Sequence, residues 1–229
     1  MNNIFDNKEE KKKDYIKRFV EKDEGDVAVY SPMDPPEAYK PMGVETVLYE
    51  EMHPVLQHFM DEHKGTNDKI DLLEAALIGM RKEGISRSTN KDLGEFFAFL
   101  DDSIVMHNLK EERVLFPILH DRMLDNGEHG TGPIPDTAVD MLENDHIKMM
   151  ELGTLTFSLM GIASRITDPV SYALLVDTAI EQGLSLVELL RLHIFREDNV
   201  VFPLAHKYLT AEDYSKITRQ MKRYFSIEL

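Results

Sequence analysis

The sequence of 229 residues is long enough for one domain with an appendage, or for two small domains. Its 42 acidic residues outnumber 26 basic residues, and the net charge of −16 repels phosphate backbones and anionic lipids, so we expect neither nucleic acid nor a membrane as a partner. The absence of cysteine excludes disulfides, iron–sulfur ligation and thiol catalysis, and it leaves nine histidines as the main candidate metal ligands.

The start of the chain is charged where a signal peptide requires an apolar stretch, and no apolar run approaches the ~20 residues that cross a bilayer. We therefore expect a cytoplasmic protein. Residues 7–24 have the pattern of a short amphipathic helix, and residues 31–43 contain four prolines, which favour an extended connector. We interpret residues 1–43 as an N-terminal extension and residues 44–229 as the main domain.

Four long segments of the main domain have apolar residues at spacings of three, four and seven, the pattern of amphipathic helices. A break at 84–90 and a loop rich in glycine and proline at 125–136 separate the first three. Asp168 followed by Pro169 predicts the start of the fourth helix, with Asp168 as its N-cap. Thr210 and Asp213 resemble a capping box and predict the start of a short final helix. These segments predict an all-α fold, an up-down-up-down four-helix bundle with a short C-terminal helix. The four segments cover about 56–80, 93–115, 139–160 and 168–200.

Each apolar stripe is interrupted by a histidine at a position where the core should lie. Two of these histidines are followed by a glutamate four residues later, and four residues turn a helix by about 400°, so that each such pair shares a face. Burying a carboxylate without a partner is costly. Two inward-facing carboxylates among four imidazoles therefore predict a shared cation. The candidate ligands are His63, His107, Glu111, His146, His193 and Glu197.

An internal repeat supports this interpretation. A lone core histidine is more often a hydrogen-bonded core residue than a ligand, but HNLKEERVLFPILH at His107 and HIFREDNVVFPLAH at His193 share one pattern. The surroundings of His63 and His146 also correspond, in MDEHKGTND and ENDHIKMME. The chain is therefore predicted to be two repeated helical hairpins, each with one histidine and one His-x-x-x-Glu pair.

Other polar residues near the motifs are not expected to bind metal. On a straight helix His120 and His206 lie about 220° from the motif histidines, which favours a structural or supporting role. Glu112 and Asp198 lie about 140° from the histidines and are expected to be surface acids. The remaining histidines lack repeat partners. They are His53, His58 and His129.

A ferritin-like di-iron bundle is the alternative, because such bundles contain Glu-x-x-His pairs. Glu143 with His146 and Glu50 with His53 have this spacing. However, Met60 stands where the first half should match Glu143, so this alternative breaks the repeat and ranks second.

The main domain, from about Val44 to Phe225, resembles the hemerythrin-like HHE cation-binding family. The resemblance lies in the H…HxxxE…H…HxxxE pattern, the E-x3-(L/V)-F-P sequences and the LTAEDY start of the last helix. It implies a four-helix bundle with two irons, bridged by the two motif glutamates and bound terminally by the histidines. Invertebrate hemerythrin has a further histidine where this chain has Leu142 or Met150, so the chain is more similar to the bacterial branch.

Some bacterial members of that family are credited with repairing iron–sulfur centres under nitric oxide stress, and they often have a cysteine-containing N-terminal domain, whereas this sequence contains no cysteine. Imidazole and carboxylate ligands suit iron, manganese or zinc, and the resemblance favours iron. Two functions stay open, capture or sensing of oxygen or nitric oxide, and reduction of peroxide, nitric oxide or oxygen with electrons from a donor protein. A metal-free interaction bundle is the third alternative, and it would leave both core carboxylates unpaired.

Each iron with four protein ligands and a bridging oxo or hydroxo group would retain an open position. The residues beside the candidate ligands are apolar, which favours a small uncharged molecule over a bulky or ionic one. These neighbours are Phe59, Ile104, Met149 and Leu190.

Overall fold

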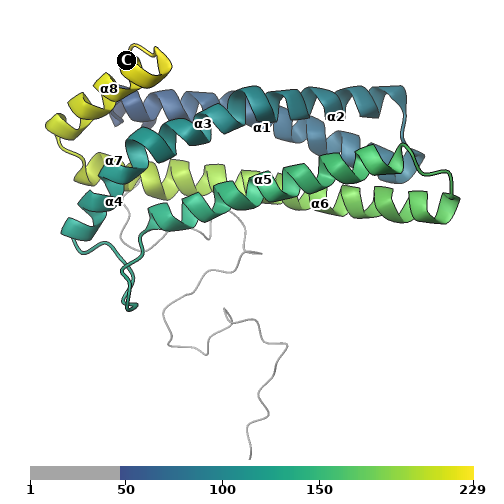
Figure 1. Ribbon diagram of the computed structural model, residues 1–229. Coiled ribbons are helices and arrows are strands. Elements are labelled where there is room, and N and C mark those ends of the chain that lie inside the picture. Colours follow the sequence, from purple (N-terminus) through teal and green to yellow (C-terminus); the bar gives the residue numbers. More distant parts are fainter. Residues whose placement is uncertain (1–46) are drawn as a thin grey trace, which may run out of the picture. The chain divides into compact units, whose positions relative to one another are not determined.

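The computed structural model describes residues 47–229, and all regular secondary structure in this range is helical, as predicted (Figure 1). The predicted N-terminal helix and connector lie outside the described residues. The elements are η2 (Tyr49–Glu51), α1 (Pro54–Glu83), α2 (Arg87–Phe99), η3 (Leu100–Ile104), α3 (Val105–Lys110), η4 (Glu111–Leu115), α4 (Phe116–Asp125), α5 (Ala138–Ala163), α6 (Pro169–Arg196), η5 (Glu197–Val201), α7 (Phe202–Tyr208) and α8 (Ala211–Phe225).

Several short elements join into long helical rods. Residues 87–125 are helical without interruption, from α2 to α4, and residues 169–208 are helical from α6 to α7. Figure 1 shows these two rods beside α1 and α5, with the α1–α2 and α5–α6 connections at the same end of the bundle. The long rods are possible because the elements within them, η3, η4 and η5, are π-helical turns that continue the helix.

Most helix starts follow the predicted capping chemistry. Asp168 accepts a hydrogen bond from the backbone N–H of Ser171 at 2.8 Å, and Thr210 forms a capping box with Asp213. The break expected at 84–90 is shorter than predicted. Ser86 and Thr89 form another capping box, so α2 already begins at Arg87.

The apolar core consists of two clusters that lie on opposite sides of the candidate ligands along every rod. In α1, His63 lies between Phe59 of the first cluster and Ile70 of the second. In α5, His146 lies between Leu142 and Met149 in the same way. The polar residues therefore form a layer across the middle of a hydrophobic core.

The short helix α8 packs at the end of the bundle where α4 and α7 lie (Figure 1). The Tyr214 ring stacks on the His53 ring at 3.9 Å, and Arg122 of α4 donates two hydrogen bonds to Asp213. Ile217 and Met221 are fully buried. Among residues 47–229, none of the helices combines the length and the apolar character that crossing a membrane requires.

Candidate metal centre

All six candidate ligands meet in the polar layer, and none is more than 9% exposed. They form two overlapping groups whose nitrogen and oxygen atoms lie within 4.8 Å of one another. One group is His63, His107 and Glu197, and the other is Glu111, His146, His193 and Glu197.

The Glu197 carboxylate lies between two histidines that come from different halves of the chain. Its Oε2 is 3.0 Å from His63 Nε2, and its Oε1 is 3.1 Å from His193 Nε2. Each oxygen therefore faces a different histidine, which is the arrangement that a carboxylate shared by two cations requires.

The Glu111 carboxylate repeats this arrangement. Its Oε1 is 3.5 Å from His107 Nε2, and its Oε2 is 3.5 Å from His146 Nε2. The two glutamates begin the π-helical turns η4 and η5, in which the N–H of the residue five positions later bonds the glutamate carbonyl. Pro117 and Pro203 come just after these turns, as the second residues of α4 and α7, and they have no N–H to donate to a regular helix.

The histidines pair across the layer. His63 Nε2 lies 3.1 Å from His107 Nε2, and His146 Nε2 lies 3.2 Å from His193 Nε2. Two nitrogens bound at right angles to one ion, with bonds of about 2.1 Å, lie about 3 Å apart. The two histidine pairs therefore fit two separate ions.

The carboxylate oxygens supply a second test of this fit. All four oxygens of Glu111 and Glu197 are buried and accept no hydrogen bond from the described residues. A buried ionised carboxylate without a partner is strongly destabilising. The donor set of imidazoles and carboxylates suits iron, manganese or zinc, so the residues present fit a metal pair.

The outer ring nitrogens of three histidines donate hydrogen bonds to acids. His63 Nδ1 bonds Asp198, and His146 Nδ1 bonds Glu112, both at 2.8 Å. Glu112 and Asp198 are at least partly exposed, as expected of surface acids, but the sequence did not indicate that they bond the clustered histidines. Both side chains reach back to the histidine of the other hairpin, and they thereby fix which ring nitrogen is free for a metal.

A second pair of acids lies one residue before the single histidines. His107 Nδ1 donates to Glu62 at 2.8 Å, and Lys110 also bonds Glu62. In the other half, Asp145 bonds Arg196 at 2.7 Å. These acids were missed from the sequence, although each directly precedes a repeated histidine, and Lys110 and Arg196 also occupy equivalent repeat positions.

The acid contact of His193 differs from the other three. Asp145 lies 3.6 Å from His193 Nδ1, which is longer than a hydrogen bond, and Nδ1 bonds no described residue. Arg196 accounts for the difference, because it holds the Asp145 carboxylate. The two halves of the centre are therefore related but not identical.

The surrounding carboxylates change the protonation of the metal-free centre. Burial lowers the pKa of His63, but the bond to Asp198 and the proximity of Glu197 outweigh it, so the pKa rises to about 10. Burial also lowers the pKa of His193, but the negative charge of Glu197 outweighs it, so this pKa rises to about 9. Burial would raise the pKa of Glu197, but His193 and His63 hold it well below its usual value. Positive charge at this position is thus strongly favoured.

The residues that were not expected to bind metal lie outside both groups. His120 bonds Thr137 at 3.0 Å, and His206 is exposed. Glu143, on which the ferritin-like alternative depended, is also outside them. The same holds for the three histidines without repeat partners, His53, His58 and His129.

A small cavity of ≈ 20 Å³ lies against the centre. Its lining contains Ile104, Met149 and Leu190, as predicted, and Phe59 makes an edge contact with the His107 ring at 5.5 Å. The polar side chain of Asn108 also lines it, which the sequence pattern did not indicate. This volume has room for about one water-sized molecule.

Comparison with known proteins relates the centre to a family. The iron-sulfur cluster repair protein YtfE of Cronobacter sakazakii is 28% identical over 159 residues, which are 69% of this chain and 66% of that protein. Proteins of the same name from Escherichia coli and Escherichia fergusonii are 27% identical over the same shares of each sequence. The chain spans about two thirds of the length of these relatives. No solved structure gives a significant match.

The family comparison covers the helices that carry the centre. Residues 55–205 match the sequence model of the hemerythrin HHE cation binding domain, and this range contains all six clustered residues. The predicted resemblance is thereby confirmed, and the family implies that the buried histidine and glutamate groups bind metal, with iron as the family's ion. The chain belongs to the hemerythrin HHE cation-binding domain family.

Proposed function

We propose that the chain holds two non-haem irons, bridged by the carboxylates of Glu111 and Glu197. His63 and His107 would bind one ion, and His146 and His193 the other. The proposal is supported by the division of the carboxylate oxygens, since each glutamate offers one oxygen to each histidine pair. Manganese and zinc are less suitable candidates. An oxo or hydroxo bridge would complete the pair.

We propose that the fold is an up-down-up-down four-helix bundle of two repeated hairpins. We also propose that the protein is cytoplasmic. Residues 1–43 would be an extension outside the bundle. We propose no nucleic-acid or membrane partner, because the net charge of −16 disfavours both.

The function supported best is binding or sensing of a small diatomic molecule, oxygen or nitric oxide. When bound, the irons would supply reversible coordination of such a molecule. The observation that carries this function is the ≈ 20 Å³ cavity against the centre, with its apolar lining of Ile104, Met149 and Leu190. These side chains would exclude ions and bulky molecules, while the acids on the outer ring nitrogens hold the imidazoles in position.

An oxidoreductase that reduces peroxide, nitric oxide or oxygen is the second candidate. It is supported by the relatives that are named iron-sulfur cluster repair proteins. This role would require electrons from a donor protein, because the sequence contains no cysteine for a redox thiol or an iron–sulfur cluster. A contribution to repair of iron–sulfur centres would follow from the same chemistry.

One experiment separates the two functions. The purified protein is reduced without air and then exposed in turn to oxygen, nitric oxide and peroxide, while absorption spectra and consumption of each molecule are recorded. We expect a stable adduct with nitric oxide or oxygen and no sustained consumption. Repeated turnover with added reductant would establish the enzyme instead, and the absence of both an adduct and turnover would contradict both functions.

Metal analysis of variants tests the ligand assignment. Glu197→Ala should lose the metal pair, because a shared carboxylate holds both ions. The matched control is His206→Ala, which should retain two irons per chain, since His206 is exposed and outside the centre. One firmly bound metal per wild-type chain, or equal iron loss in both variants, would contradict the assignment.

A further inference from the structure

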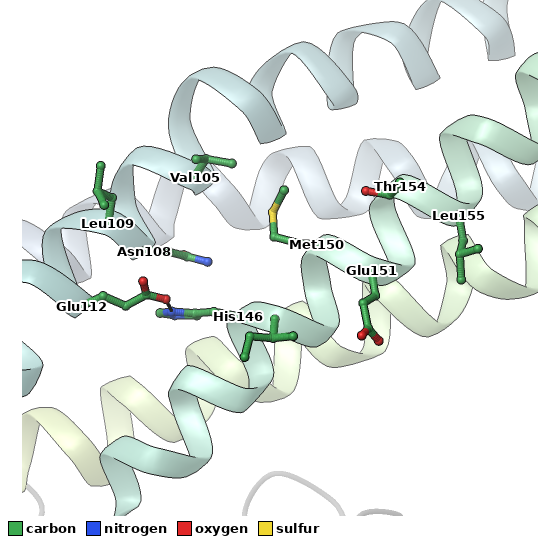
Figure 2. Close-up of a pocket in the computed structure, with 10 residues that line it drawn as sticks. Val105, Asn108, Leu109, Glu112, His146, Met150, Glu151, Thr154 and Leu155 are labelled. Carbon is green, nitrogen blue, oxygen red and sulfur yellow. Dashed lines mark hydrogen bonds and ion pairs between the residues drawn. The ribbon is translucent and has the colours of Figure 1, made fainter.

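A large groove lies between α3 and α5 and borders the metal centre at His146, whose outer side lines it (Figure 2). Its volume is ≈ 770 Å³, within the range of about 300–1,000 Å³ that holds organic ligands. One end is polar, where Asn108, Glu112 and His146 come together. Toward the other end the lining is mostly apolar, with Val105, Met150 and Leu155 (Figure 2).

The two halves of the pseudo-symmetric bundle differ at this groove. On the corresponding face, α1 and α6 are in direct contact, because Gly183 allows Leu77 to approach closely and Arg191 bonds acids of α1. Beside the groove, Glu112 of η4 accepts a hydrogen bond from His146 of α5 at the end nearest the metal centre. The rods touch again beyond the other end, where Phe97 meets Phe157. The opening is thus a specific departure from the repeat.

One side-chain amide in the wall of this groove has no hydrogen-bond partner among the described residues. Asn108 is only 7% exposed, yet its side chain forms no hydrogen bond with the described residues. Glu112 uses one oxygen for His146, and its other oxygen accepts no hydrogen bond from them. The Asn108 amide is therefore free to form hydrogen bonds with a polar group that binds in the groove.

The polar end of the groove indicates which kind of chemical group can bind there. A hydroxyl group can donate to the Glu112 carboxylate and at the same time accept from the Asn108 amide. An anionic head group would be repelled by Glu112 and by the net charge of −16. The apolar walls favour a hydrocarbon or aromatic body along Val105 and Met150.

We propose that this groove binds an uncharged apolar molecule with a terminal hydroxyl group, such as an alkylated phenol. The hydroxyl lies between Asn108 and Glu112, and the apolar body extends toward Leu155. Because Glu112 also bonds the outer nitrogen of His146, the bound hydroxyl acts on the carboxylate that orients this histidine. The groove forms from protein side chains alone, so binding does not require the proposed oxygen or nitric oxide chemistry.

The test uses the full chain as purified and measures binding of three probes by isothermal titration calorimetry. The probes are 4-pentylphenol, 4-pentylanisole, in which a methyl group replaces the donated hydrogen, and 4-pentylbenzoate, which is an anion. We expect the phenol to bind about tenfold more tightly than the anisole and the benzoate, which corresponds to one hydrogen bond lost or one charge repelled.

Two variants locate the site. Asn108→Leu should weaken 4-pentylphenol about tenfold, because it removes the amide that donates to the ligand oxygen. Val105→Phe should abolish binding by filling the groove, whereas Val170→Phe, a matched change at a residue 78% exposed on α6, should have no effect. Thermal melts verify that each variant is folded.

Three results would overturn the proposal. The first is equal affinity for the phenol and the anisole, and the second is preference for the benzoate. The third is equal binding by Val105→Phe and Val170→Phe. All three outcomes are independent of whether the irons form an adduct with nitric oxide.

Discussion

Three of the four clustered histidines are held at their outer nitrogen by a carboxylate, and this contact predicts how single residues affect metal affinity. Asp198→Ala removes the hydrogen bond from His63, so metal affinity should fall about 10–100-fold. Asp145→Ala should have a smaller effect, because His193 lies 3.6 Å away and donates no bond to it. Competition with a chelator measures both affinities. Equal losses would show that the outer hydrogen bond does not orient the ring.

The sequence predicted the six clustered histidines and glutamates better than the acids that bond these histidines. His63 and Glu197 were identifiable because a polar residue repeated on an apolar face has few explanations other than a ligand. Asp198 was misjudged because its angle was measured against the histidine of its own helix, whereas its partner, His63, belongs to another rod. The repeated acid after each motif glutamate was the available signal.

Helix packing gives a prediction at the level of elements. An added Cβ at Gly183 in α6 would lie 2.7 Å from Leu77, which is fully buried. Gly183→Ala should therefore destabilise the protein by about 1–3 kcal/mol. Gly94→Ala is the matched control, because its Cβ would meet nothing within 4 Å, and it should stabilise α2 by about 0.5–1 kcal/mol. Urea denaturation measures both, and the same sign for both changes would contradict the close approach of α1 and α6.

The contact of α8 with α4 gives a pH-dependent prediction. The hydrogen bonds from Arg122, against the opposing effect of burial, lower the pKa of Asp213 to about 2. A carboxyl with a lowered folded-state pKa adds stability above its unfolded pKa of about 3.9, and this stability is lost as the pH falls toward 2.

The corresponding variant is Asp213→Asn. The difference in unfolding free energy between the wild type and this variant should be largest above about pH 5 and should shrink as the pH falls toward 2. Chemical denaturation followed by circular dichroism between pH 2.5 and 6 measures it. A difference that stays constant with pH would mean that the Arg122 contact is not electrostatic.

Helix starts were predictable where local chemistry specifies them, as at Asp168 and Thr210. The π-helical turns at Glu111 and Glu197 were not, because apolar periodicity near 3.6 residues cannot reveal one extra residue in a turn. The prolines at 117 and 203 indicated that the regular α-helix is interrupted nearby, but they did not indicate that the interruption is a π-helical turn.

For the whole molecule, we predict that metal binding and folding are linked. Without a cation, the Glu111 and Glu197 carboxylates must be balanced by protons on the histidines or by water. A loss of about 3 kcal/mol would lower the melting midpoint by roughly 10 °C in a chain of this size. Thermal melts of the metal-free and iron-loaded protein test this. Glu197→Ala is the control, since its midpoint should not respond to iron, and equal wild-type midpoints would contradict the linkage.

The groove between α3 and α5 was outside the reach of sequence analysis. Apolar periodicity identifies which face of each helix is buried, but it does not determine how far apart two neighbouring rods lie. The exposed apolar residues Ile147 and Leu155 of α5 are consistent with the opening, yet in the sequence they read as ordinary members of a helix rich in methionine and leucine.

The acids around the centre also determine its electroneutrality. The four outer acids and the two shared glutamates carry six negative charges, and Lys110 and Arg196 supply two positive ones. The four missing positive charges equal those of two divalent ions bound by neutral imidazoles. In the metal-free protein, protons on histidines such as His63 take their place. The proposed metal pair would thus be neutralised in the divalent state, whereas a trivalent pair would leave an excess of two positive charges. The charge pattern of the helices would therefore favour the reduced state of the proposed irons until an anion enters to balance this excess.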